Sequence, residues 1–288
     1  MKTVPPLGAS YRLQFNRGFG FADAAALTPY LHALGITHIY ASPILKARAG
    51  SPHGYDIVDH NAINPELGDA AGFAAFVGTL HLHGMGLILD IVPNHMGVGK
   101  DNHWWLDVLE NGEASPYAAY FDIDWHPANT ALHNKVLLPL LGDHYGAVLE
   151  RGELELAFDP HQGTFEVRYF EHCVPLDPRT YPHILDRARE LAQLQTGIDD
   201  ESLAALDGLI ADCKSLPART VPSAARREAR LAGAAACKLR LAELCGRHAV
   251  IRVCIERSVT RCNGMPDDPD SFDALHRLLE AQAYRLAY

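Results

Sequence analysis

The sequence lacks the short motifs that identify several large classes of enzyme. It contains no H-E-x-x-H pair for zinc, no G-x-x-x-x-G-K phosphate loop and no G-x-S-x-G nucleophile turn. None of its six cysteines forms a C-x-x-C pair, so a zinc ribbon or a thioredoxin-like site has no support. We therefore expect neither a metal ion nor another cofactor.

Positive charge is also scarce, because 25 Lys and Arg residues face 35 Asp and Glu residues and leave a net charge of -10. An acidic chain is a poor partner for nucleic acid or for an anionic membrane. No stretch approaches the roughly 20 apolar residues of a membrane span, and no apolar signal segment follows Met1. With most cysteines in a helix-rich stretch, where buried thiols are common, we expect a cytoplasmic protein with reduced thiols.

The chain does contain ample apolar material, 48% of its residues, which is enough for one large core or two domains. Strands are predicted over residues 10–15, 36–41 and 87–92, with an amphipathic helix between each pair. Gly35 ends the first helix, and Asp69 can cap the second. This order predicts a parallel sheet with right-handed crossovers, which begins either a barrel or an open doubly wound sheet.

The regular alternation of strand and helix is interrupted by a predicted loop over residues 42–68 and stops after residue 96. A short strand over residues 136–141 is weakened by Pro139. Alternating residues in 153–158 and 164–170 predict a β-hairpin.

Helices dominate the rest of the chain. Residues 183–262 show helical periodicity throughout, and a last helix is predicted to run from Phe272 to Tyr288 without a stop signal. We therefore divide the chain into three βα units over residues 1–96, an inserted subdomain over 97–262 and a return helix over 263–288.

Polar residues follow the third predicted strand at once, in the segment DIVPNHM from Asp90 to Met96. Ligands of α/β folds bind at the carboxyl ends of strands, where Asn94 and His95 would project. The imidazole of His95 can donate a hydrogen bond to a sugar hydroxyl. Asp90, placed inside the strand, needs a buried partner such as arginine. The alternative is a structural aspartate and a satisfied core histidine, but the density of polar residues favours a site.

Two other segments carry candidate sugar contacts. In the segment SPHGYD, Gly54 lets the backbone approach a ligand closely, and Tyr55 offers an aromatic face and a hydroxyl. On its own this segment is an ordinary turn with a packed tyrosine. Trp104, Trp105 and Trp125 fall in one aromatic-rich stretch, which suits a carbohydrate. The alternative is that these aromatic residues form the small core of the inserted subdomain.

Together these segments resemble the α-amylase superfamily, in which D-x-x-x-N-H follows the third barrel strand. The resemblance implies that His95 contacts the sugar at the cleaved subsite and that Tyr55 stacks on the same sugar. It also implies that Asp90 holds an arginine located two positions before the nucleophile, with Asn94 in support. Three further candidates for substrate contact are His53, Trp104 and Trp105.

The likeness is closer to one member family, the malto-oligosyltrehalose synthases. It covers nearly the whole chain in order, through the segments YRLQF, HGYD, PELG, DIVPNHM, WWLDVLEN, SPYAAYFDIDW, KVLLP and LLEAQAYRLAY. It implies the first part of a (β/α)8 barrel of the TIM type, with a large and mainly helical insertion after strand three. The nucleophile and the general acid would lie beyond Tyr288, so no residue here is assigned as catalytic.

The implied reaction is an intramolecular transglycosylation of a maltooligosaccharide, which turns the α-1,4 link at the reducing end into an α,α-1,1 trehalose link. A trehalose-releasing hydrolase would be a functional partner. The 288-residue chain alone is expected to be an inactive fragment. Two alternatives stay open: another hydrolase or glucanotransferase of the superfamily, and a non-catalytic glucan-binding fragment.

Overall fold

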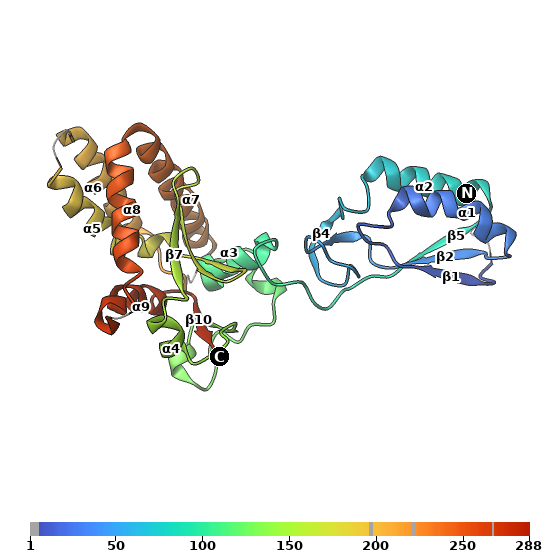
Figure 1. Ribbon diagram of the computed structural model, residues 1–288, viewed down its shortest axis with the longest axis horizontal. Coiled ribbons are helices and arrows are strands. Elements are labelled where there is room, and N and C mark those ends of the chain that lie inside the picture. The colour runs from blue at the N-terminus through green and yellow to red at the C-terminus, as the bar shows by residue number, and fades with distance from the viewer. Residues whose placement is uncertain (1–5, 196–197, 221–222, 267) are drawn as a thin grey trace. The chain divides into compact units, whose positions relative to one another are not determined.

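The computed structural model describes residues 6–195, 198–220, 223–266 and 268–288. The chain forms two compact units, Met1–His103 and Trp104–Tyr288 (Figure 1). Among the described residues, no helix combines the length and the apolar character that crossing a membrane needs. The division between the units falls near the predicted end of the three βα units, but the predicted subdomain boundaries stay a prediction.

A parallel sheet forms the centre of the first unit, as predicted. Its three strands lie in the order β1-β2-β5, and both pairings are parallel. Two helices cover one face of this sheet (Figure 1). The bounds are β1 Ser10–Leu13, α1 Phe21–Ala33, β2 His38–Ala41, α2 Ala70–Leu82 and β5 Gly86–Leu89.

The core of the first unit is rich in phenylalanine. Phe21 lies at its centre, with ring centroids 5.7 Å from Phe15 and 6.5 Å from Phe76. Such ring pairs add about 0.5–1.5 kcal/mol beyond the area that they bury. The predicted cap of α2 is confirmed, since the Asp69 carboxylate accepts a hydrogen bond of 2.7 Å from the amide of Gly72. These contacts fix both helices against the sheet.

Two predictions for the first unit were wrong. The stretch expected to be a loop contains an irregular antiparallel pair, β3 Leu45–Ala47 and β4 Ile57–Ile63. Only Ile57 and Val58 of β4 are buried, and they are neighbours. Buried and exposed residues therefore do not alternate along β4, so the pattern that predicts a strand is missing. The strand β5 ends at Leu89, three residues before the predicted end. Asp90 therefore follows the strand rather than lying inside it.

The second unit holds the predicted hairpin and the predicted helices. The hairpin strands β7 Glu155–Asp159 and β8 Thr164–Tyr169 are antiparallel, and a third strand, β9 His172–Pro175, extends the sheet. Helices fill the stretch predicted as helical, and they pack into one large core with the sheet. Their bounds are α5 Pro182–Gln193, α6 Asp200–Ser215, α7 Ala224–Arg247 and α8 Ala249–Cys262.

Shorter elements make up the remainder of the second unit. The strand β6 Val136–Pro139 confirms the predicted strand and ends at its proline. The bounds of the others are α3 His103–Asn111, η1 Gly112–Ala114, η2 Ala118–Tyr120, η3 Thr130–Leu132, α4 Tyr145–Glu150, η4 Pro178–Thr180, η5 Pro269–Phe272, α9 Asp273–Glu280 and β10 Tyr284–Ala287.

The prediction of one helix up to Tyr288 was wrong, because α9 ends at Glu280 and the strand β10 follows. The strand β10 pairs in parallel with β6. Buried Gln282 marks the change, since its Oε1 accepts from the amide of Asp177 at 2.9 Å. Tyr284 and Leu286 alternate in the strand, but Ala283 and Leu286 also fit a helical period with Leu275 and Leu279.

A buried ion cluster holds the loops of the second unit together. The side chain of Asp177 is 3% exposed and that of Arg230 is 0% exposed, with 2.7 Å between Oδ1 and Nη2. A second guanidinium, of Arg219, lies 3.3 Å from Oδ2 of the same carboxylate. Arg230 also donates to the carbonyl of Pro217 at 2.7 Å. One carboxylate thus connects η4, α7 and the loop before α7.

Replacing Arg230 by methionine is expected to lower the free energy of unfolding by about 3 kcal/mol, because a buried Asp177 loses its closest cation. Urea unfolding followed by circular dichroism measures this loss. Arg168→Met serves as the control, since Arg168 forms an exposed pair with Glu166 and its loss should change stability by less than about 1 kcal/mol. Equal losses of unfolding free energy in the two variants would show that the buried cluster stabilises the protein no more than an exposed ion pair does.

Candidate functional site

Three polar side chains of the first unit lie on the sheet face opposite the helices. In the parallel register Arg12 of β1 is the partner of Tyr40 of β2, and Tyr40 is the partner of Ile88 of β5. Side chains two residues apart share a face of a strand, so Asp90 continues the side of Ile88. Arg12, Tyr40 and Asp90 therefore meet at the carboxyl edge of the sheet.

The carboxylate of Asp90 is the centre of this group. Its Oδ2 accepts a hydrogen bond of 2.9 Å from the Tyr40 hydroxyl and a second bond from the Tyr55 hydroxyl. Arg12 donates to the Tyr55 oxygen at 3.0 Å, and its guanidinium carbon lies 5.6 Å from the centre of the Tyr40 ring. The hydrogen bond to Asp90 raises the pKa of Tyr40, and the bond to Tyr55 raises the pKa of Arg12.

The loop that carries Tyr55 is fixed by its own hydrogen bonds. Ser51 Oγ accepts from the amide of Gly54 at 3.1 Å and donates to Asp56 at 2.5 Å. Gly54 has a φ of +77°, and a Cβ there would lie 2.9 Å from the carbonyl oxygen of Pro43. Only glycine avoids both the strain and the clash. The close approach at Gly54 thus serves packing against Pro43.

The structure brings His95 and Tyr55 together, as the resemblance implied. His95 Nε2 lies 3.0 Å from the backbone carbonyl of Tyr55, and its Nδ1 lies 3.0 Å from Oδ1 of Asn94. Because a carbonyl only accepts, Nε2 is the donor in the first contact. The ring is exposed at the surface of the unit. His95 therefore supports the backbone of the tyrosine loop, and Asn94 lies beside its other ring nitrogen.

His53 lies at the margin of the same group. Its Nδ1 accepts from the amide of Tyr55 at 3.0 Å, and its backbone carbonyl accepts from Gln14 Nε2 at 3.0 Å. Gln14 in turn accepts from Arg12 at 2.8 Å. The exposed imidazole of His53 could still face a ligand, because these contacts engage only one of its ring nitrogens.

Trp104 and Trp105 belong to the second unit. Trp104 stacks on Tyr117 with 5.3 Å between centroids and 7° between planes, and it also contacts Tyr120. Trp105 lies 5.1 Å from Phe121 and packs against the main core of the unit. For Trp105 the alternative of a core residue is therefore supported. A substrate role for either tryptophan stays a prediction.

Sequence reasoning missed Arg12, Tyr40 and Gln14, and it did not foresee the two tyrosine hydroxyls that donate to Asp90. The signal was present in the alternation of β1 and β2, since Arg12 and Tyr40 interrupt apolar positions near the ends of their strands. Recognising it requires the strand register, which places both residues beside Asp90. Single segments do not reveal that register.

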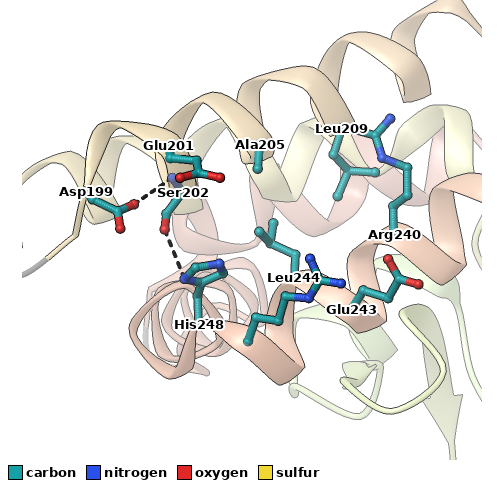
Figure 2. A pocket seen from close by; sticks show the side chains of 10 residues that line it. Asp199, Glu201, Ser202, Ala205, Leu209, Arg240, Glu243, Leu244 and His248 are labelled. Carbon is teal, nitrogen blue, oxygen red and sulfur yellow. Dashed lines mark hydrogen bonds between the residues drawn. The ribbon is translucent and has the colours of Figure 1, made fainter.

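A serine and a histidine meet in the second unit, where a cavity of about 410 Å³ lies between α6 and α7 (Figure 2). Ser202 Oγ lies 2.9 Å from His248 Nδ1, and the amide of Ser202 donates to Asp199 at 2.8 Å. Ser202 is buried, and Asp199 is the N-cap of α6. These contacts join helix ends, and the buried hydroxyl is poorly placed for attack on a substrate.

The family described as "Alpha amylase, catalytic domain" matches residues 25–147. Those residues are similar to part of an α-amylase catalytic domain. A Mycobacterium tuberculosis protein, provisionally named maltooligosyl trehalose synthase, is 44% identical over 173 residues, which is 55% of this chain and 22% of that protein.

Solved structures show the same similarity. A maltooligosyltrehalose synthase from Arthrobacter ramosus is 41% identical, with a TM-score of 0.52 over 60% of this chain and 21% of its own. A glycosyltrehalose synthase structure is 28% identical, with a TM-score of 0.56 over 97% of this chain and 26% of its own. The chain thus has maltooligosyl trehalose synthases as homologues, and it spans about a fifth to a quarter of their length.

Replacing Asp90 by asparagine is expected to lower the pKa of Tyr40 toward its ordinary value, because the hydrogen bond to the carboxylate is the main cause of the rise. The chemical shift of labelled tyrosine Cζ, followed against pH, measures this change once Tyr40→Phe has assigned the signal. Asp59→Asn, which removes the same charge from β4, should leave the Tyr40 titration unchanged. A Tyr40 pKa that is the same in both variants would contradict the role of Asp90.

Proposed function

We propose that the protein containing this chain is a maltooligosyl trehalose synthase, an isomerase that transfers a glucosyl unit within one maltooligosaccharide. The observation that carries the proposal is the 44% identity to a relative named for this activity, over 173 residues. Supporting it, a glycosyltrehalose synthase structure aligns with 97% of the chain, including its helical part. The substrate is then an α-1,4-glucan.

The proposed fold is the first part of a (β/α)8 barrel, with residues 97–262 inserted after the third barrel strand and residues 263–288 leading back to the barrel. The three parallel strands β1, β2 and β5 would be the first three strands of this barrel. Barrel enzymes bind substrate at the carboxyl ends of their strands. The group around Asp90 lies at that edge, which supports a substrate-binding role for Tyr55, His95 and His53.

The geometry at Asp90 also fits its proposed role as a support for an arginine. Both phenol hydroxyls bind Oδ2, and no described side chain donates to Oδ1. The free oxygen can accept a charge-assisted hydrogen bond from a guanidinium supplied by another part of the protein. In this proposal Asp90 holds the arginine, while Tyr55 and His95 border the sugar and Asn94 orients His95.

The chemistry of such an enzyme retains the anomeric configuration. One carboxylate attacks the anomeric carbon and another protonates the leaving oxygen, with about 5–5.5 Å between them. Both groups are proposed to lie outside the 288 residues of this chain. The released glucose would stay bound and attack the glycosyl-enzyme through its own anomeric hydroxyl. The trehalosyl product would be the substrate of a trehalose-releasing hydrolase.

A hydrolytic activity is the second candidate, since the intracellular maltogenic amylase of Bacillus subtilis is 41% identical over 98 residues. Incubating the full-length protein with maltopentaose separates the two. We expect a product of unchanged mass that no longer reduces copper, because the α,α-1,1 link removes the free anomeric carbon. The 288-residue chain alone should show no turnover. Release of maltose or shorter reducing sugars as the main products would favour the hydrolase.

The synthase must keep water from the glycosyl-enzyme, and we propose that aromatic residues of the second unit help to exclude it. Trp104→Ala in the full-length protein should raise the ratio of free glucose to trehalosyl product several-fold, measured by chromatography of the sugars. Phe170→Ala, which removes an exposed aromatic ring of the same unit, should leave the ratio unchanged. An unaltered ratio in the Trp104 variant would reject this role.

A further inference from the structure

Arg12 of β1, together with Gln14 just after the strand, reaches the loop between β3 and β4 at two points. The Nη2 of Arg12 donates to the hydroxyl oxygen of Tyr55 at 3.0 Å, and its Nη1 donates to Oε1 of Gln14 at 2.8 Å. Gln14 Nε2 in turn donates to the backbone carbonyl of His53 at 3.0 Å. One guanidinium therefore holds this loop at a side chain directly and at the backbone through Gln14.

The partners of Tyr55 fix the orientation of its hydroxyl group. An ionised carboxylate only accepts hydrogen bonds, so the single hydrogen of this hydroxyl points to Oδ2 of Asp90. A guanidinium only donates, so Arg12 occupies a lone pair of the same oxygen. The phenol oxygen thus lies between a cation on β1 and a carboxylate that follows β5. Removing the cation would leave only one of the two contacts that hold the ring tip.

The guanidinium of Arg12 is itself held in place, although the residue is exposed. Arg12 is the register partner of Tyr40, and its guanidinium carbon lies 5.6 Å from the centre of the Tyr40 ring. A cation at this distance is attracted by the face of the ring. The hydrogen bond to Tyr55 also raises the pKa of Arg12, so this contact favours the charged form. Residues of two strands therefore fix the side chain that reaches the loop.

The shape of the arginine side chain matters as well as its charge. Its Nη1 and Nη2 engage two different acceptors at the same time, which the fixed fork of a planar guanidinium allows. A lysine ammonium is a point charge on a flexible stem and does not reproduce this fork. Lysine at position 12 would still balance the charge of Asp90. The fork therefore distinguishes a positioning role from charge balance alone.

We propose that Arg12, acting with Gln14, is a positioning residue that holds the Tyr55 ring and the backbone at His53 in the orientation that the sugar requires. This inference rests on the proposed function, in which Tyr55 borders the sugar at the cleaved subsite. Arg12 would not touch the reacting atoms. Because correct placement counts most in the transition state, loss of Arg12 should lower kcat more than it raises KM.

Double-mutant kinetics of the full-length protein with maltopentaose test this role. We expect Arg12→Met to lower kcat about tenfold and to change KM less than about twofold. In combination with Tyr55→Phe the same substitution should lower kcat by at most about threefold, because the acceptor through which Arg12 acts is already absent. A role of Arg12 in the stability of β1 alone would give the same loss in both backgrounds, and that result would overturn the proposal.

Three further variants examine the fork, the contact through Gln14 and the net charge. Arg12→Lys should recover little of the lost kcat, and full recovery would overturn the proposal by showing that charge suffices. Gln14→Leu should lower kcat less than Arg12→Met does, and an unchanged kcat would overturn the part assigned to Gln14. Arg17→Met is the matched control, since Arg17 is exposed in the same unit and makes no hydrogen bond or ion pair with a described residue. Thermal melts establish that each variant is folded.

A measurement on this chain separates the contact from the reaction. The Cζ signal of labelled tyrosine, assigned to Tyr55 by Tyr55→Phe, should move in Arg12→Met and stay in place in Arg17→Met. Only the first variant removes a hydrogen bond to the phenol oxygen. An unmoved signal in Arg12→Met would overturn the proposal whatever the full-length protein does. Wild-type full-length protein that forms no trehalosyl product would instead refute the proposed function, and the tyrosine signal would still report the contact.

Discussion

One carboxylate oxygen organises the candidate sugar site. Asp90 Oδ2 accepts from a tyrosine on β2 and from a tyrosine on the loop between β3 and β4, so a strand and a loop share one acceptor. The parallel register makes this possible, because it aligns Arg12 and Tyr40 on the face that Asp90 continues. Arg12 then balances the charge through Tyr55. The position of the Tyr55 ring therefore depends on this shared acceptor as well as on the hydrogen bonds within the loop.

Local rules predicted much of the fold. Asp69 caps its helix, the alternating segments form β7 and β8, and helical periodicity identified the elements from α5 to α8. The errors in secondary structure arose where a strand depends on pairing with another segment of the chain. The strand β4 is stabilised by β3 rather than by its own pattern, and β10 is a strand because β6 lies beside it. For the site, DIVPNHM and HGYD were found as motifs, but Arg12 and Tyr40 depend on a register that no single segment encodes.

The second unit concentrates buried charge around Asp177, whose two guanidinium partners come from a loop and from α7. Burying a carboxylate is favourable only when its partners are held in place, so this cluster fixes the loop that contains Arg219. The same loop borders a cavity of about 430 Å³. An ion cluster that stabilises the unit thus also sets the position of the Arg219 side chain at the edge of that cavity.

The pairing of β6 with β10 has a consequence for biosynthesis. The two strands are more than a hundred residues apart in the sequence, yet each supplies the other with its parallel partner. Contacts of such separation form late, because a long loop must close before they are made. During translation β6 leaves the ribosome long before β10, and its backbone groups lack their parallel partner while the helices α4 to α9 emerge. A chaperone that shields this edge would therefore be most useful in the interval before residue 284 is free.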